Sequence, residues 1–393
     1  MKATRSMSAH FLMLLALAFA VCTVPRLAYA QGRLAASVQP YLDDHTIAGA
    51  VMLVANSKGV VATEVAGLAD PFANVPMTAD RLFNIASMTK TFTATAIMML
   101  QDQGKLSVDD PVSKYIPEFA QQQVSVKADD GTVTRRAPAS PLLIRQLLSH
   151  MSGFTNAQHW NQSLPIAEQA KVLAAEDMPF DPGAHYEYCN KNFLTAGRII
   201  EVVSGKPYAD FIRDYITKPL GMEETTFWPT ARQLAKMVKP YRSLDHDPWF
   251  SPLGGRGYLF PYDPSASPIA PNPAGSLISC AADLSRFCRM LLNGGTLDGT
   301  RILSESAVKQ MSARQTPIGP NMPPYGFGMA LDGDSFGHGG AWSTDMRVYP
   351  KQGLAAIILM QNAGYLKGKD RGLMIKPFDE AVLKTYGKPV GGV

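Results

Sequence analysis

The stretch from Asn84 to Lys90 constrains this chain more than any other. It places Ser87 three residues before Lys90, and a run of apolar residues and threonines, from Thr91 to Leu100, follows directly. Such a run predicts a buried helix that begins near Ser87. Residues three apart share one face of a helix, so the lysine amine can reach the serine hydroxyl. The stretch therefore predicts a serine nucleophile with its base beside it, on an element that belongs to the core.

The same spacing occurs a second time in the chain. Ser306 and Lys309 repeat it, because serine and lysine are common enough for the pattern to arise by chance. A Ser-x-x-Lys motif that stands alone is most often a turn of a surface helix with a solvated lysine. The case for Ser87 depends on the residues that accompany it elsewhere in the sequence.

The first thirty residues differ from the rest. Lys2 and Arg5 precede an apolar run over residues 11–24, and small residues surround a cleavable bond after Ala30. This pattern is typical of a secretory signal peptide rather than of a membrane anchor. We expect residues 1–30 to be removed, which leaves a periplasmic or secreted protein with no stable membrane anchor.

The mature chain is nearly neutral, because removal of residues 1–30 takes the formal net charge from +4 to +1. This charge argues against nucleic acid or a strongly anionic membrane as a partner. Three cysteines remain, so at most one disulfide forms; Cys280 and Cys288 are predicted either as that pair or as two buried free thiols. Metal-binding motifs and glycine-rich phosphate loops are absent from the sequence, so no metal or nucleotide cofactor is expected.

The pattern of expected helices, strands and loops changes along the mature chain. We expect an α/β sheet domain that is discontinuous and consists of residues 31–110 and 270–393. Residues 111–240 show helical periodicity with proline punctuation, which predicts an inserted all-helical subdomain. Residues 241–269 are rich in proline, glycine and aromatic residues, and we interpret them as an ordered loop near the site.

Several elements of the sheet domain have well-marked ends. Helices are expected at residues 34–44, 281–292 and 372–386, and strands at residues 49–55 and 353–360. Elements from the two ends of the chain thus enclose the helical middle. A site can form at the seam between such parts.

A serine hydroxyl attacks at neutral pH only if a neighbouring base has a lowered pKa. Lys90 can supply that base if it is buried. Tyr188 and Asn190 form a Tyr-x-Asn motif that follows a Pro-Gly turn. The tyrosine could shuttle the serine proton to the leaving group, and the amide could hold the lysine and the substrate carbonyl. By itself the motif is weak, and a half-buried tyrosine is the commoner explanation.

A further candidate element is the stretch His338, Gly339, Gly340 and Ala341, at the start of an expected edge strand. Glycines there allow a substrate to lie against the strand backbone. The N–H groups of Ala341 and Ser87 could form an oxyanion hole, worth about 3 kcal/mol per donor. The alternative is a glycine-rich turn with an incidental histidine.

Other aromatic and histidine side chains have less definite roles. Trp249, Phe250, Tyr258 and Phe260 either line an acyl or alcohol pocket or pack among themselves in the loop, and the sequence favours neither. His150 is interpreted as a structural residue at the end of a helix.

Taken in order, these motifs resemble the serine β-lactamase and DD-peptidase superfamily, and in particular its class C-like branch. The resemblance covers nearly all of the mature chain. It is carried by five blocks that stand in the family's order: residues 83–90, 147–154, 182–190, 275–287 and 337–340.

The resemblance implies a β-lactamase/transpeptidase-like fold of the α/β (α+β) class, an antiparallel sheet flanked by helices with an inserted all-helical subdomain. It also implies that Ser87 is the acylated nucleophile and that Lys90 and Tyr188 transfer protons. Asn190 would orient the substrate, and the N–H groups of Ser87 and Ala341 would form the oxyanion hole.

One departure from the family pattern bears on the substrate. Class C β-lactamases carry Lys-Thr-Gly where this chain has His338, Gly339 and Gly340, so the lysine that helps to bind the β-lactam carboxylate is missing. His-x-Gly is similar to the motif of D-stereospecific peptidases, and variants also occur in family VIII carboxylesterases. The chain has no Gly-x-Ser-x-Gly motif of the α/β-hydrolases.

The expected function is a carboxylesterase that acts on small or medium acyl esters. The alternatives are a β-lactamase, DD-peptidase or D-amino-acid peptidase acting on β-lactams or cell-wall peptides, and a penicillin-recognising protein without turnover.

Overall fold

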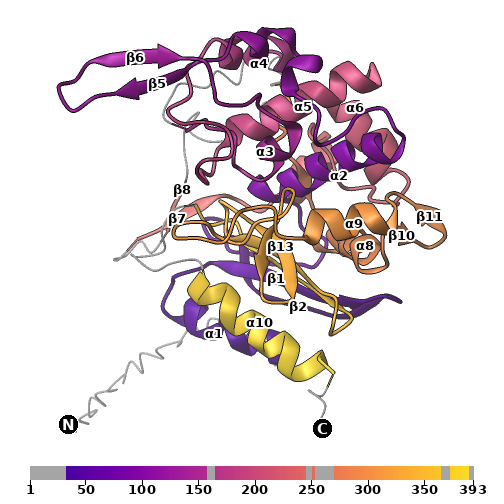
Figure 1. Cartoon of the computed structure of the whole chain (residues 1–393). Helices are drawn as coiled ribbons and strands as arrows, with labels where there is room; N and C mark the ends of the chain where they lie inside the picture. The colour runs from indigo at the N-terminus through magenta and orange to yellow at the C-terminus, as the bar shows by residue number, and fades with distance from the viewer. Residues whose placement is uncertain (1–31, 157–163, 245–249, 253–269, 364–371, 389–393) are drawn as a thin grey trace, which may run out of the picture.

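A computed structural model of the chain describes residues 32–156, 164–244, 250–252, 270–363 and 372–388. Its centre is a seven-stranded sheet in the order β12-β13-β14-β15-β1-β2-β3, in which the strands pair antiparallel (Figure 1). The strands of this sheet are β1 (Gly49–Asn56), β2 (Val60–Asp70), β3 (Val75–Pro76), β12 (Ala330–Asp332), β13 (Ser335–Gly340), β14 (Thr344–Tyr349) and β15 (Leu354–Leu359).

Strands from the two ends of the chain meet in the middle of the sheet. Val51 of β1 lies opposite Leu359 of β15. β15 is buried throughout and β1 is buried except for its last residue, because helices cover both faces of these strands. Continuous apolar runs, rather than alternating ones, are therefore what these two strands require.

Two terminal helices cover one face of the sheet, α1 (Arg33–Asp43) and α10 (Gly372–Tyr386), which lie together at the bottom of Figure 1. They bury Leu34, Val38 and Phe378 in one cluster with residues of β1 and β15. α8 (Ala281–Leu292) packs on the opposite face, against β1, β14 and β15. The sheet is thus the middle layer of three.

α2 (Thr89–Asp102) connects this sheet layer with the helical part of the molecule. It is buried from Thr89 to Leu100, as expected for a helix whose run from Thr91 to Leu100 consists of apolar residues and threonines. Its buried hydroxyls are satisfied: Thr91 Oγ1 donates to Gly328 O, and Thr93 Oγ1 donates to Pro273 O. A single hydrophobic cluster extends from the sheet through α2 into the helical part, so the two parts share one core.

The helical part lies above the sheet in Figure 1 and packs around α2. Its helices are α3 (Ile144–Leu148), α4 (Ile166–Ala174), α5 (Asn190–Ser204), α6 (Tyr208–Ile212) with a following π-helical turn (Arg213–Thr217), and α7 (Ala231–Lys236); α9 (Glu305–Ser312) packs against α2 from later in the chain. Short 3₁₀ segments are η1 (Ala86–Met88), η2 (Val112–Lys114) and η3 (Pro117–Gln121).

The prediction of an all-helical insertion needs one correction. Residues 111–240 contain a β-hairpin, β5 (Val124–Lys127) and β6 (Val133–Arg136), which projects from the helices in Figure 1. Its strands have four residues each and are mostly exposed. Val124 and Val126 alternate with Ser125 and Lys127, and Asp130-Gly131 is a turn signal, so a local strand pattern is present but short. The remaining short ladders are β4 (Phe83–Asn84) with β9 (Ile278–Ser279), β7 (Tyr241–Ser243) with β8 (Phe250–Pro252), and β10 (Thr296–Leu297) with β11 (Thr300–Arg301).

Other predictions agree closely with the structure. The helices expected at residues 281–292 and 372–386 have these bounds in α8 and α10. Cys280 and Cys288 are buried free thiols, so the disulfide alternative is wrong. Within the described residues, no helix has both the length and the apolar character that a membrane crossing requires. The predicted signal peptide, residues 1–30, lies outside the described residues.

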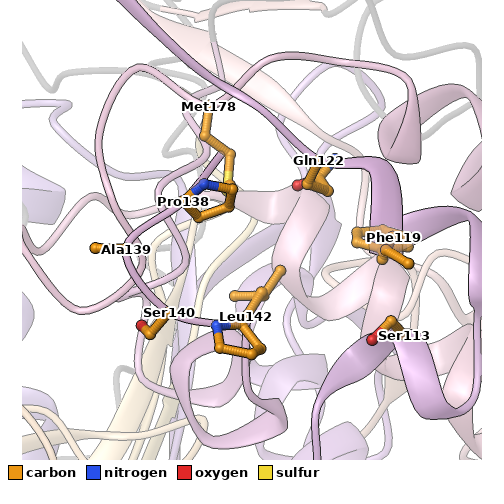
Figure 2. A pocket seen from close by; sticks show the side chains of 10 residues that line it. Ser113, Phe119, Gln122, Pro138, Ala139, Ser140, Leu142 and Met178 are labelled. Atoms are coloured by element: carbon orange, nitrogen blue, oxygen red, sulfur yellow. The ribbon is translucent and has the colours of Figure 1, made fainter. Parts of the chain in front are cut away.

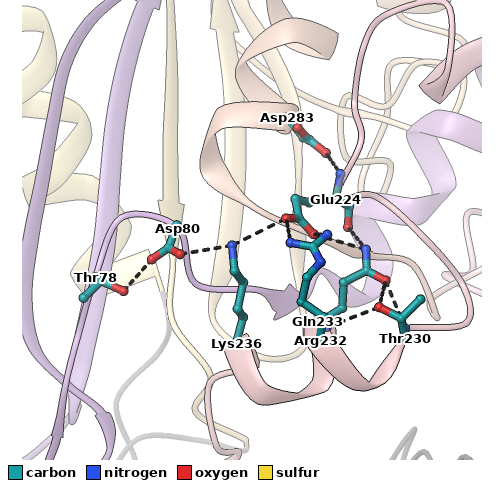
Figure 3. Close-up of polar contacts among 8 residues, drawn as sticks. All are labelled: Thr78, Asp80, Glu224, Thr230, Arg232, Gln233, Lys236 and Asp283. Carbon is teal, nitrogen blue, oxygen red and sulfur yellow. Dashed lines mark hydrogen bonds and ion pairs between the residues drawn. The ribbon is translucent and has the colours of Figure 1, made fainter.

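A polar network fixes the segment that leads into the stretch from Asn84 to Lys90 (Figure 3). Lys236 of α7 bridges Asp80 at 3.1 Å and Glu224 at 3.5 Å, and Arg232 makes a bidentate pair with Glu224. Asp283, in the first turn of α8, accepts from the Glu224 N–H at 2.9 Å. The network ties the chain just before β4 to α7 and α8, and β4 leads directly to Ser87.

Candidate active site

Ser87 lies on the short turn η1, directly ahead of α2. Ala86 has a φ of 45°, in the left-handed region that residues other than glycine rarely occupy. Its N–H donates to Asn84 Oδ1 at 2.7 Å, and the Asn84 N–H donates to Gln361 Oε1 at 3.0 Å. The residues on both sides of Ser87 are buried, whereas Ser87 is partly exposed. Strained backbone of this kind persists mainly at functional sites, and here it presents one serine to solvent.

Lys90 is fully buried beneath this serine. Its Nζ lies 3.0 Å from Ser87 Oγ, 2.8 Å from Asn190 Oδ1 and 2.7 Å from Ala274 O. An amide oxygen and a backbone carbonyl only accept hydrogen bonds, whereas a hydroxyl can also donate. In the neutral amine, the two N–H groups therefore point to Asn190 and Ala274, and the lone pair faces the Ser87 hydroxyl. This is the arrangement that a general base needs.

Burial lowers the pKa of Lys90 well below its usual value, because the ammonium form loses its hydration. The neighbouring Cys189 opposes this shift, but burial also raises the pKa of the Cys189 thiol to about 11. The thiol therefore stays neutral near pH 7 and leaves Lys90 without a compensating anion. The amine is thus able to be neutral where an exposed lysine is charged.

Tyr188 and Asn190 reach Lys90 from the start of α5. The Lys90 Nζ lies 4.9 Å from the centroid of the Tyr188 ring. Asn156 holds this segment in place: its Nδ2 donates to Tyr188 O at 2.8 Å, and its Oδ1 accepts from the Asn190 N–H at 2.9 Å. The structure therefore brings together Ser87, Lys90, Tyr188 and Asn190, as the sequence motifs predicted.

The stretch from His338 to Gly340 forms the end of β13, not the start of an edge strand as predicted. The edge strand is β12, which pairs only with residues 335–337. Among the described strands, none pairs with residues 338–340 on that side. β12 thus ends before this part of the β13 backbone.

Gly340 lies against the turn that carries Ser87. A Cβ atom at Gly340 would come within 2.5 Å of Ile85 O and 3.2 Å of Ala86 Cβ. The Thr344 Oγ1 donates to the same Ile85 O at 3.3 Å. Only glycine permits this approach, which sets the end of β13 directly on η1.

Ala341 follows this contact in the chain. In the described part of the chain, the backbone N–H groups of Ser87 and Ala341 donate to no backbone or side-chain acceptor. Because Gly340 packs on Ala86, the two donors belong to adjoining segments. Donors that are held in place and not otherwise engaged are what an oxyanion hole requires.

His338 is buried, and both of its ring nitrogens contact the protein. Nδ1 lies 2.6 Å from Gly339 O, and Nε2 lies 2.9 Å from Tyr325 Oη. Burial raises the pKa of Tyr325 well above its usual value, so the phenol keeps its proton. In the neutral imidazole, Nδ1–H donates to the carbonyl and Nε2 accepts from the Tyr325 hydroxyl.

The predicted aromatic pocket does not join this cluster in the described residues. Phe250 packs with its ring 4.9 Å from the Tyr241 ring and 6.3 Å from the His45 ring, and none of its described ring contacts is to the four catalytic candidates. The other predicted members, Trp249, Tyr258 and Phe260, lie outside the described residues. The pocket assignment therefore stays a prediction.

The second Ser-x-x-Lys pair is a surface feature of α9. The Lys309 Nζ pairs with Glu305 Oε1 at 2.8 Å, and its side chain is 75% exposed. Ser306 Oγ lies 2.9 Å from Ser304 Oγ. The Ser-x-x-Lys spacing therefore does not make a base of Lys309, because this lysine stays hydrated and paired with Glu305.

Four groups that contact the site were not predicted as part of it. The Ala274 carbonyl binds Lys90, Asn156 clamps the Tyr188 segment, Tyr325 binds His338, and the His150 ring lies 4.4 Å from the Tyr188 ring. A backbone carbonyl leaves no signal in a sequence. His150 stands within the Leu-Leu-Ser-His block, which is the one signal that could have drawn attention to it.

A surface cavity of about 310 Å³ lies elsewhere, between η2, η3 and the segment before α3 (Figure 2). Phe119, Leu142 and Met178 give it an apolar wall, and none of the predicted site residues lines it. Within the described residues, no group of three or more His, Cys, Asp or Glu side chains is arranged to hold a metal ion.

Comparisons with known proteins agree with this geometry. The family model described as Beta-lactamase matches residues 34–374. Penicillin-binding protein 4 of Amycolatopsis lactamdurans is 30% identical over 341 residues, which cover 80% of this chain and 81% of that protein. Esterase EstB of Burkholderia gladioli is 28% identical over 236 residues, 55% of this chain and 56% of the esterase.

A solved structure has the same fold. It is titled "EstCE1, a hydrolase with promiscuous acyltransferase activity"; the TM-score is 0.71 at 22% sequence identity, with 89% of this chain and 97% of that chain covered. The predicted β-lactamase/transpeptidase-like fold, with its antiparallel sheet, is confirmed. The chain therefore belongs to the beta-lactamase family and has the fold of its serine hydrolases.

Proposed function

We propose that this protein is a carboxylesterase that hydrolyses small to medium acyl esters through an acyl-enzyme on Ser87. The observation that carries the proposal is the set of contacts around Lys90. Its Nζ lies 3.0 Å from Ser87 Oγ, and its other two contacts are pure acceptors. A buried amine in this position removes the serine proton.

In the proposed reaction, the neutral Lys90 accepts the Ser87 proton as Oγ bonds to the ester carbonyl carbon. The N–H groups of Ser87 and Ala341 stabilise the oxyanion of the tetrahedral intermediate. When the intermediate collapses, the C–O bond to the alcohol breaks and the alcohol takes a proton from the Lys90–Tyr188 pair. Water then attacks the acyl-enzyme by the same route, releases the acid and restores Ser87. Asn190 orients both Lys90 and the substrate carbonyl.

The surroundings of His338 favour esters over substrates that carry a carboxylate. This residue stands where class C enzymes have a lysine, and both of its nitrogens already contact Gly339 O and Tyr325 Oη. Because both ring nitrogens are engaged within the protein, the side chain has no N–H left to bind a substrate carboxylate. Esterase EstB is among the relatives, and so is penicillin-binding protein 4. Hydrolysis of β-lactams or cell-wall peptides is therefore the second candidate, and non-catalytic penicillin recognition is the remote one.

A direct comparison of substrates tests this proposal. The purified protein is assayed with p-nitrophenyl esters of graded acyl length and with a chromogenic cephalosporin, and release of each chromophore is followed. We expect kcat/KM for the best ester to exceed that for the cephalosporin by at least about 100-fold. Robust cephalosporin turnover with negligible ester turnover would instead support the β-lactamase alternative. If neither is turned over while Ser87 is labelled by a fluorescent β-lactam, the protein is a recognition protein.

We also propose that the protein is exported to the periplasm or secreted. The support is the charged, then apolar, then small-residue pattern of residues 1–30. N-terminal sequencing of the protein recovered from the exported fraction should begin at Gln31. Recovery of uncleaved protein from the cytoplasm alone would contradict this assignment.

A further inference from the structure

His150 lies at the point where the chain leaves α3, and its ring is completely buried. Its φ is 58°, in the left-handed region that costs free energy for a residue with a side chain. This conformation turns the ring into an aromatic cluster with Tyr186, Tyr188, Phe193 and Tyr325. Backbone strain at a residue that contacts Tyr188 therefore indicates a functional role for His150.

His150 accepts two hydrogen bonds from the residues on either side of Tyr188. The backbone oxygen of His150 accepts from the Glu187 N–H at 2.9 Å, and its ring Nδ1 accepts from the Cys189 N–H at 3.1 Å. Between these two bonds, the His150 ring lies 4.4 Å from the Tyr188 ring. One residue thus holds the backbone on both sides of Tyr188 and also contacts its ring.

The chemistry of this contact specifies a neutral imidazole. Nδ1 must carry a lone pair, because the N–H of Cys189 and the Nδ2 of Asn192 both point to it. The single ring proton then resides on Nε2, which is buried without a partner among the described residues. Burial lowers the pKa of His150 well below its usual value, and nearby Lys90 lowers it further. The ring is therefore an acceptor that adds no charge beside Lys90.

We propose that His150 is a positioning residue for Tyr188, and that the acceptor at its Nδ1 keeps the Tyr188 ring over the Lys90 amine. The proposal deepens the proposed function and depends on the role of Tyr188 in it. His150 itself need not touch the substrate. Packing alone does not explain why a histidine stands here. An apolar ring would fill the same space, but it would leave the buried Cys189 N–H without an acceptor.

The matched variants are His150→Asn and His150→Gly. Both residues tolerate a positive φ, but only asparagine places an oxygen acceptor near the position of Nδ1. We expect His150→Asn to retain kcat within about 5-fold of wild type, and His150→Gly to lose about 100-fold in kcat with little change in KM. His185→Asn, at an exposed histidine, is the control for loss of a histidine ring and should leave kcat unchanged. Denaturant unfolding of each variant reports its stability.

A double-mutant cycle separates positioning from general support of the fold. In a Tyr188→Phe background, His150→Gly should lower kcat by less than about 3-fold, because the group that His150 positions is already disabled. An undiminished loss in that background, or equal losses in the asparagine and glycine variants, would overturn the proposal. Should the glycine variant fail to fold, the test rests on His150→Asn alone, and a loss in kcat of more than about 5-fold in that variant would overturn the proposal.

Labelling with a fluorophosphonate distinguishes failure of this inference from failure of the proposed function. If wild-type Ser87 is not labelled, the serine mechanism is wrong and the positioning role is overturned with it. If wild-type Ser87 is labelled and His150→Gly is labelled at the same rate, only the positioning role is overturned. Slower labelling of His150→Gly than of His150→Asn supports it.

Discussion

We expect the replacement of Ser87 with alanine to abolish the proposed ester hydrolysis. The substitution removes the oxygen that becomes acylated, while the Ala86 turn and the contacts of Lys90 to Asn190 and Ala274 do not depend on it. We expect kcat to fall by at least about 10⁴-fold, as when other serine hydrolases lose their nucleophile. The measurement is hydrolysis of the best p-nitrophenyl ester, together with mass spectrometry of the protein after treatment with a phosphonate.

The chain supplies its own control for this result. Ser306→Ala removes a serine at the same distance from a lysine, but on the exposed face of α9, and it should leave both activity and labelling unchanged. Full activity in Ser87→Ala would refute the acyl-enzyme mechanism. Phosphonate label found on another serine would refute the assignment of the nucleophile.

Replacing Lys90 with methionine keeps the length of the side chain but removes the base. We expect kcat/KM to fall by about 10³-fold, within the range that general bases contribute. In the wild type, activity should rise with pH as Lys90 loses its proton. Because burial lowers the pKa of Lys90, this rise should be complete well below pH 10.5, where an exposed lysine titrates. The measurement is kcat/KM as a function of pH for both proteins.

Lys309→Met is the matched control, since Lys309 pairs only with Glu305 in the described structure and is mostly exposed. It should leave the pH profile unaltered. A wild-type profile that rises only near pH 10.5 would show that Lys90 is not the depressed base. An acid limb that persists with the same midpoint in Lys90→Met would assign the titration to another group.

The helices were predictable because their ends carry local signals. Ala281 to Leu292 is followed by Asn293 and two glycines, both of which have a positive φ, and residues of that kind end a helix at a definite place. The central strands were predictable as well, because continuous apolar runs of this length must be buried on both faces. These features depend on residues that are neighbours in the chain.

The place of His338 in the sheet shows why other features were not predictable. Its place at the end of β13, and not at the start of an edge strand, follows from the short β12, which covers residues 335–337 alone. The β5–β6 hairpin carries a local signal, Val124 and Val126 in alternation before an Asp130-Gly131 turn, but its strands have only four residues each and do not stand out among the helices around them. How far a neighbouring strand extends is decided by the paired backbones of the folded sheet, and residues 338–340 do not themselves encode it.

The sequence by itself singled out the residues that we propose do the chemistry: Ser87, Lys90, Tyr188 and Asn190 stand in motifs whose order identifies the family. The tertiary structure decided how they can act. Burial is a property of the whole fold, and it is the burial of Lys90 that lowers its pKa and suits an ordinary Ser-x-x-Lys spacing to the proposed nucleophile and base. The exposed Lys309, at the same spacing, has no such environment.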